Sequence, residues 1–461
     1  MDTEAQAKEG KGRKLGPARA VVFVVGSMVG AGIFGLPNSL GAIGTVSLIG
    51  LALAAVGALA LAATFGGLAK HTGGEGGPFE YARDAFGNGA GFWTAWFFWL
   101  SAWATTAAVV VIWVSYCRYL LPGATWYAIV VGMVGLWLPV VVNLLGTRWM
   151  STVQTVSVIL AFIPLIVLCV VGPFRVTSAL FGPFVDSGMS RFSAIMHSLT
   201  VSAIVFLGVE AVAVLSNRVR DPARNVSRAS LIGTAICAAL YLLATFVVFG
   251  TVSNEALRSG LSSFADSFSY ITGSPNAGKL MAVTAVLSGF GGLVAWALLG
   301  AEVPRVAADA RMFPAIFART NARRVPAAGM IISTLLASAL MVEAFAGGVG
   351  ADVFDSIAVI SAIGAGVVYV FCGSAEVRRL WRQETSSRHR ILRMTAAVIG
   401  LVFSLVVIGG SLASKAMDAL AFWMLLGWIA VGAAVLMRQR RRNATTKSGI
   451  NDRPVHTSDG Q

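Results

Sequence analysis

The chain has 461 residues, of which 56% are hydrophobic and 12% are charged, and its formal net charge is +14. Soluble globular domains of this length have a lower apolar share, so the composition predicts a polytopic membrane protein. The positive charge does not indicate nucleic-acid binding, because the basic residues are spread over short segments that border apolar stretches.

An apolar stretch needs roughly 20 residues to cross a hydrocarbon layer of about 30 Å. We therefore expect an all-α protein with twelve transmembrane helices, at 19–42, 45–69, 90–117, 126–145, 151–173, 193–216, 229–251, 276–302, 327–347, 353–375, 391–412 and 417–437.

The lysines and arginines are distributed unevenly between the two sides of these spans. If the N-terminus is cytoplasmic, 29 of the 35 lie in cytoplasmic segments and six lie outside. This bias predicts a plasma-membrane (inner-membrane) protein with both termini in the cytoplasm. The run R-Q-R-R-R at Arg438 is interpreted as a stop-transfer anchor.

The first span contains the run V-G-S-M-V-G-A-G-I-F-G-L-P, from Val25 to Pro37, with four glycines. Gly26 and Gly30 have the spacing that permits close helix packing. Alternatively, the segment from Gly30 to Gly32 lets the helix unwind. Backbone groups freed in this way are tolerated at membrane depth only where they line a cavity or a ligand.

The sixth span favours the second interpretation, because it contains V-F-L-G-V-E with Gly208 and Glu210 near its middle. Spans one and six begin two consecutive groups of five. Interruptions at corresponding positions of two halves indicate an inverted-repeat transporter and its binding site.

Glu210 is the acidic residue that the sequence singles out. A charge at mid-span costs about 2.5–3.5 kcal/mol, so by default it marks a pathway or a proton relay. The alternative is a buried carboxyl with permanent hydrogen bonds. Other acidic residues lie nearer the span ends and are expected to be solvated: Glu302, Glu343, Asp352 and Asp355.

Five motifs occur along nearly the whole chain: G-A-G-I-F-G-L-P at Gly30, G-G-P-F-E-Y-A-R-D-A-F-G at Gly76, F-L-G-V-E at Phe206, D-P-A-R-N-V at Asp221 and P-R-V-A-A-D-A-R-M-F-P-A-I-F-A-R at Pro304. In sequence and order they resemble the amino acid–polyamine–organocation superfamily. Within it, the chain is most similar to the arginine/agmatine antiporter and related basic amino acid/polyamine antiporters.

The resemblance implies a LeuT-type fold, with a five-plus-five inverted repeat and broken helices one and six. It divides the chain into a cytoplasmic tail (1–18), a transport core (19–375), a loop with spans eleven and twelve (376–437) and a basic tail (438–461). A homodimer is also considered, since relatives are often dimers.

The resemblance also implies a substrate site. The substrate's α-carboxylate is expected at the N–H groups of Ala31, Gly32 and Ile33, and its α-amino group at carbonyls of Met28 and of the segment from Ile204 to Leu207. A half-helix N-terminus attracts an anion and unwound carbonyls attract a cation, so an amino-acid zwitterion suits both poles.

The side-chain pocket departs from the arginine exchangers. Trp296 aligns with an aromatic residue that stacks on a guanidinium group there, a contact worth about 2 kcal/mol or more when desolvated; core packing or a lipid-facing position is the alternative. Ile204 stands in place of a gating tryptophan. The remaining residues expected to line the pocket are Phe98, Ser101, Ala102, Thr106 and Ser361.

The coupling mode is inferred from what the fifth span contains. Some proton-driven members have a lysine at a position that matches Ala161 here. The sequence therefore favours an antiporter that exchanges amino acids, cationic ones or their amine products, over a proton-coupled permease for small neutral amino acids, which Ile204 would suit. An integral-membrane enzyme is a weaker alternative.

The four cysteines and four histidines are scattered, without C-x-x-C or H-E-x-x-H spacing. We expect no catalytic residues, no metal site and no cofactor. The expected partners are the amino-acid substrate, its counter-substrate and membrane lipids, and Glu210 is the candidate for gating or proton coupling.

Overall fold

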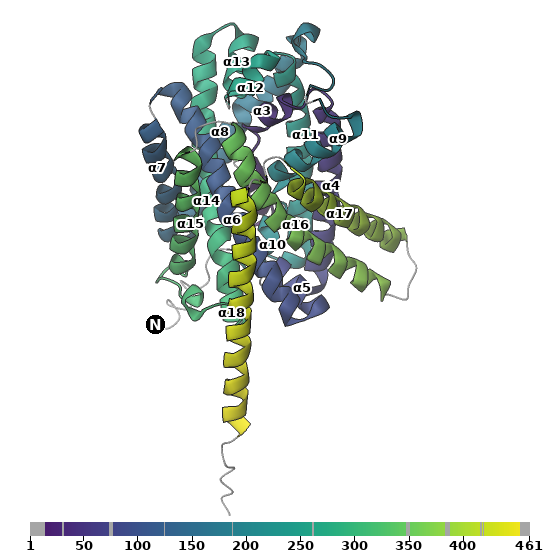
Figure 1. Cartoon of the computed structure of the whole chain (residues 1–461), viewed down its shortest axis with the longest axis vertical. Helices are drawn as coiled ribbons and strands as arrows, with labels where there is room; N and C mark the ends of the chain where they lie inside the picture. The colour runs from purple at the N-terminus through teal and green to yellow at the C-terminus, as the bar shows by residue number, and fades with distance from the viewer. Residues whose placement is uncertain are drawn as a thin grey trace, which may run out of the picture.

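The computed structural model describes residues 14–29, 32–72, 77–123, 125–186, 188–260, 262–346, 351–382, 388–414, 417 and 419–451 (Figure 1). In this part of the chain the regular structure is helical, apart from one isolated β-bridge between Leu15 and Val219. The long helices are α4 (Ser47–Thr72), α6 (Asn88–Leu120), α7 (Thr125–Leu144), α8 (Thr147–Val171), α11 (Pro222–Phe249), α14 (Pro275–Asp309), α15 (Ala327–Ala346), α16 (Ala351–Trp381), α17 (Arg388–Leu412) and α18 (Ala419–Asn451).

The shorter helices join or interrupt the long ones. They are α2 (Pro17–Val29), α3 (Leu36–Gly41), α5 (Pro78–Phe86), α9 (Arg191–Ala203), α10 (Ala211–Val214), α12 (Asn254–Ser259) and α13 (Ser263–Thr272), with 3-10 turns η1 (Gly172–Phe174), η2 (Ser178–Leu180), η3 (Ile204–Phe206), η4 (Ser216–Arg218) and η5 (Ala315–Ala318).

Eleven helical segments of the described residues are long and apolar enough to cross a membrane, and α2 is a shorter apolar helix. The predicted all-α membrane protein is therefore confirmed. Each predicted span after the first coincides with one of these segments. The first, 19–42, is divided between α2 and α3, and each of these helices is too short to cross a bilayer alone.

α6 and α14 form the centre of the bundle (Figure 1). α6 is apolar on all sides, and 89% of its most apolar window is buried inside the protein. A helix that is apolar all round is suited to such a position. α14 packs along α6, and α16 packs between α6 and α17.

α18 has the opposite character, since only 17% of its most apolar window is buried. It is joined to α6 by two stacked indoles, Trp96 and Trp428, whose ring centroids are 4.6 Å apart. Each indole N–H donates to the backbone carbonyl of the other residue, at 3.0 and 3.3 Å. α18 continues beyond the predicted span end at 437, because the polar stretch that follows has no glycine or proline before Gly449.

Short helices gather at the two ends of the bundle. Figure 1 shows α3, α12 and α13 at one end and α5 at the other. We call these ends the α3 side and the α2 side, because the chain passes from α2 through the first break to α3. The two sides bound the candidate site, which lies between them.

Candidate functional site

The sixth membrane segment is broken at the predicted position. α9 continues into the 3-10 turn η3, and Leu207 is extended, with φ -60° and ψ 136°. Gly208 follows with φ 105°, a left-handed conformation that favours glycine. The chain becomes α-helical again only at α10, after Glu210. The interruption predicted at Gly208 is therefore confirmed.

The first segment is broken between the end of α2 at Val29 and the start of α3 at Leu36. Ala31 lies outside the described residues, so its contact with a carboxylate stays a prediction. Among the described residues, the amide N–H groups of Gly32 and Ile33 have no hydrogen-bond acceptor. Two buried donors are thus available, as the interpretation of an unwound helix requires.

The two breaks touch each other. A Cβ added at Gly32 would lie 2.9 Å from Cγ1 of Val205 in η3, and one added at Gly208 would lie 2.9 Å from Oγ of Ser27 in α2. Real side chains do not approach so closely. Glycine is needed at both positions, because any larger residue would force the broken segments apart.

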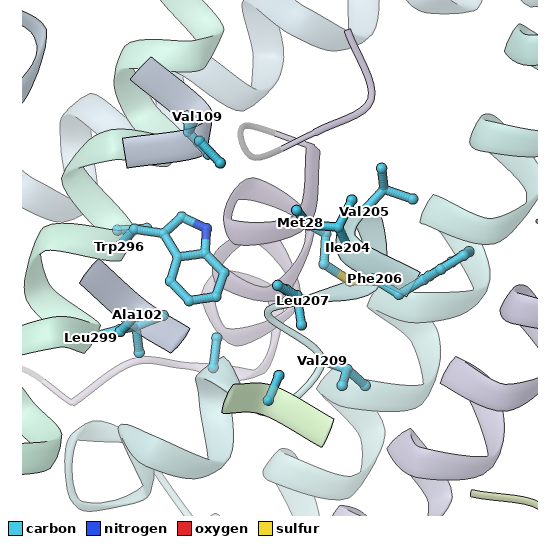
Figure 2. Close-up of a cluster of buried hydrophobic side chains, with 14 of the residues drawn as sticks. Met28, Ala102, Val109, Ile204, Val205, Phe206, Leu207, Val209, Trp296 and Leu299 are labelled. Carbon is cyan, nitrogen blue, oxygen red and sulfur yellow. The ribbon is translucent and has the colours of Figure 1, made fainter. Parts of the chain in front are cut away.

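Trp296 of α14 packs against the end of α2. It is 1% exposed, and its indole N–H donates to the carbonyl oxygen of Ser27 at 3.1 Å. The last carbonyls of a helix have no partner within that helix, so this bond satisfies one of them. Figure 2 shows the indole pointing from α14 toward Met28 and Leu207. The ring borders both breaks.

The predicted site residues that the structure describes are buried, and most are apolar. Ala102, Met28 and Leu207 lie around Trp296, with Ile204 beyond Met28 (Figure 2), and Phe98 lies on the same helix as Ala102. A cavity of about 10 Å³ lies beside Gly32, between α6 and α14. This volume suits one water molecule.

Hydroxyl groups link α6 to α16. Ser361 of α16 lies 2.5 Å from the hydroxyl of Thr105 and donates to the carbonyl of Ser101 at 3.2 Å. Gly364 allows this approach, because a Cβ there would lie 2.8 Å from the Phe97 carbonyl. Thr106, which is predicted to line the pocket, donates its hydroxyl to the Ala102 carbonyl within its own helix at 2.8 Å.

Glu210 joins the sixth break to α16. It is 2% exposed, and one carboxylate oxygen accepts hydrogen bonds from the hydroxyl of Tyr369 at 2.7 Å and from the N–H of Gly208 at 3.3 Å. Tyr369 was not predicted. It lies eight residues after Ser361, on the same side of α16, and this spacing is the signal that could have identified it.

One group of charged residues packs on the α2 side, and we call it the ionic closure. Glu302 of α14 is 0% exposed and lies 3.3 Å from Arg218 and 2.9 Å from Arg305. Leu15, before α2, pairs with the strand-like segment at Val219, and its N–H donates to the Arg218 carbonyl at 2.7 Å. The expectation that Glu302 is solvated is wrong, because two arginines surround its carboxylate.

The α3 side has uncharged contacts, which we call the neutral closure. The side-chain amide of Asn38 donates to the Leu257 carbonyl at 2.8 Å and accepts from the Ser263 hydroxyl at 2.8 Å. The hydroxyl of Tyr116 donates to the Phe34 carbonyl at 3.2 Å. The Phe34 ring also makes edge-to-face contacts with the rings of Tyr116 and Phe264.

The other acidic residues give a mixed result. Glu343 is exposed, as expected, while the side chains of Asp352 and Asp355 lie outside the described residues. In the part of the chain that the structure describes, no three histidine, cysteine, aspartate or glutamate residues are placed to hold a metal ion.

Comparison with known proteins decides the family. The family described as "Amino acid permease" matches residues 15–437. The chain belongs to the amino acid permease family. It is 31% identical to the putrescine transporter PotE of Escherichia coli over 342 residues, which cover 72% of this chain and 76% of PotE. It is 27% identical to the cadaverine/lysine antiporter of the same organism over 412 residues, 87% of this permease and 90% of the relative.

A solved structure shows the same fold. The crystal structure of the Eremococcus coleocola manganese transporter, in complex with an aromatic bis-isothiourea compound, has a TM-score of 0.53 at 14% identity and covers 92% of this permease and 94% of that chain. The family and the fold indicate a transport role. The inverted repeat and the full count of twelve spans stay predictions.

Proposed function

We propose that this permease is a secondary active antiporter that exchanges amino acids across the membrane by alternating access, with cationic amino acids or their amine products as substrates. One observation carries the proposal: two broken helices meet inside the protein, and the amide donors of Gly32 and Ile33 have no acceptor among the described residues. Relatives named as a putrescine transporter and a cadaverine/lysine antiporter support the substrate class and the exchange mode. Neither name favours the permease for small neutral amino acids.

The freed backbone groups suit the two poles of a zwitterion. The N–H groups at Gly32 and Ile33, with that of Ala31, would receive the α-carboxylate, since they lie before the N-terminus of α3. The α-amino group would lie at carbonyls of Met28 and of the segment from Ile204 to Leu207. Because the breaks touch, both poles can be held by one small molecule.

The substrate side chain would lie against Trp296. Its indole N–H is fixed to α2, so a ring face is held in a constant orientation for a cationic group. Buried apolar neighbours, Ala102 and Leu299, exclude water and strengthen that contact. The hydroxyls of Ser101, Thr106 and Ser361 supply the remaining polar groups expected near the pocket.

Glu210 is proposed to couple the sixth break to α16, with proton binding as part of the cycle. Its carboxylate is held by Tyr369 and Gly208, so a change in its protonation alters a bond between two elements that border the site. We expect Glu210→Gln to flatten the pH dependence of exchange without abolishing binding. An unchanged pH profile would remove this role.

The sidedness follows from the basic residues. We propose that the α2 side is cytoplasmic in the plasma (inner) membrane, because most lysines and arginines fall in segments on that side. The homodimer that relatives suggest stays a prediction.

The test is exchange in liposomes. Vesicles preloaded with unlabelled lysine or putrescine should take up labelled lysine much faster than empty vesicles, without a sodium gradient. The empty carrier reorients slowly, because its unwound backbone groups lack the substrate that satisfies them. Labelled alanine, presented in the same way, serves as the neutral control.

Two results would contradict the proposal. One is equal uptake by empty and preloaded vesicles, and the other is concentrative uptake into empty vesicles driven by an imposed proton gradient. A variant tests the side-chain pocket separately: Trp296→Leu should weaken lysine binding by more than about tenfold, since the stacked cation loses roughly 2 kcal/mol. Unchanged affinity would assign Trp296 to packing alone.

A further inference from the structure

A groove that shares no residue with the candidate site lies where α16 ends on the α2 side. It has a volume of about 440 Å³ and runs between α16, the last residue of α5 and the middle of α17. The residues that line it are Phe86, Ser374, Val377, Arg378, Trp381, Arg382 and Leu401.

The lining residues of α16 form one face of the helix, with the three- and four-residue spacing that places side chains above one another. Along this face the character changes. Val377, with Leu401 of α17, makes the inner part apolar, while Arg378, Trp381 and Arg382 make the outer part basic and aromatic. A ligand for the whole groove therefore has an apolar end and an anionic end.

The two arginines differ from their neighbour Arg379. Arg379 donates two hydrogen bonds of 2.9 Å to the buried carboxylate of Glu376. Among the described residues, neither Arg378 nor Arg382 has a carboxylate partner, and both are exposed. The guanidinium of Arg378 lies 5.3 Å from the ring centroid of Phe86, which holds it across the groove.

The groove lies where a membrane surface would be. α16 is a membrane-spanning segment that ends at Trp381, and this tryptophan is 79% exposed. Exposed tryptophans at the ends of spans are typical of the head-group level, and arginines beside a span attract acidic lipids. The position of Trp381 and the charge of the two arginines thus both suit an acidic lipid.

We propose that this groove binds one anionic phospholipid, with its phosphate between Arg378 and Arg382 and an acyl chain along Val377 and Leu401. Guanidinium groups form short, paired hydrogen bonds with phosphate oxygens. The bound lipid would contact α16, the helix that carries Ser361 and Tyr369 of the candidate site. The groove does not depend on the proposed antiport, since it is formed by different residues.

The test is lipid retention by the full-length protein, measured by native mass spectrometry after extraction from vesicles of equal phosphatidylglycerol and phosphatidylcholine. We expect the parent protein to retain phosphatidylglycerol in preference. Arg378→Gln/Arg382→Gln should reduce that retention by about tenfold or more, since each arginine near the surface contributes about fivefold. The control Arg438→Gln/Arg440→Gln removes two charges from exposed positions of α18 and should leave retention unchanged.

Three outcomes would overturn the proposal. Equal retention of the two lipids would show that the groove does not select negative charge. Unchanged phosphatidylglycerol in the Arg378→Gln/Arg382→Gln variant would place the lipid elsewhere. Displacement of the lipid by millimolar inorganic phosphate would assign the two arginines to a soluble anion. A thermal unfolding midpoint equal to that of the parent, measured without added lipid, checks that the variant is folded.

Discussion

The ionic closure and the neutral closure lie on opposite sides of one site but are built differently. On the α2 side a single carboxylate, Glu302, holds two arginines. On the α3 side the contacts are spread over the hydrogen bonds of Asn38 and Tyr116 and over three aromatic rings. The ion pairs of the ionic closure converge on one buried carboxylate, whereas the contacts of the neutral closure are spread over several groups.

The difference predicts unequal responses to substitution. When one partner is removed from a buried ion pair, the remaining charge is left uncompensated, at a cost of about 3–5 kcal/mol. An unpaired buried hydrogen-bonding group costs about 1–3 kcal/mol. A single substitution in the ionic closure should therefore destabilise the α2 side more than a single substitution in the neutral closure destabilises the α3 side.

The largest effect is expected for Glu302→Gln, which keeps the shape and removes the charge between Arg218 and Arg305. The free energy of unfolding should fall by about 3 kcal/mol, because a fully buried carboxylate that pairs with two partly buried arginines is lost. A thiol reagent added from the α2 side should then label Met28→Cys faster.

The matched control is Asp309→Asn. Asp309 also pairs with Arg305, at 2.6 Å, but it is 49% exposed, so its loss should cost about 0.5 kcal/mol or less. Similar labelling rates in the Glu302→Gln protein and its parent would mean that Glu302 does not close the α2 side.

A smaller effect is expected for Asn38→Leu on the α3 side. The change leaves the Leu257 carbonyl and the Ser263 hydroxyl without partners, which should cost about 2 kcal/mol in unfolding free energy. The Met28→Cys reporter should be labelled faster from the α3 side only. Faster labelling from the α2 side would show that the closures are not independent.

The smallest effect is expected for Tyr116→Phe. The bond to the Phe34 carbonyl and a hydrogen bond with the Phe264 backbone are lost, while the ring contacts remain, so the cost should be about 1 kcal/mol. Thermal unfolding of the single variant and of a double variant with Asn38→Leu measures whether the two effects add. Strict additivity is expected only if the two contacts act separately.

Part of this architecture could be predicted from the sequence because it depends on local chemistry. Apolar stretches predicted the long helices, and Gly208 predicted the sixth break, since a positive φ needs glycine. Glu210 was predicted to have a role in gating or proton coupling, because an isolated carboxyl at mid-span is costly. In each case the prediction needs only the residue itself and its neighbours in the sequence.

What could not be predicted depends on contacts between distant parts of the chain. Tyr369 is 159 residues from Glu210, and Arg218 is 84 residues from Glu302, so neither pairing follows from spacing. The contact of Thr105 with Ser361 was also not predicted, although Thr105 lies four residues after Ser101 and so shares its helix face.

α18 has a mechanical consequence. Its 33 residues give a length of roughly 50 Å, while the hydrocarbon layer is about 30 Å thick, so about 20 Å of helix stands beyond it. Figure 1 shows this end projecting from the bundle. A load on the projecting end reaches the protein through the contacts of α18 with α16 and α6, among them the paired indoles of Trp428 and Trp96. α18 thus connects its projecting end directly to α6, the helix at the centre of the bundle.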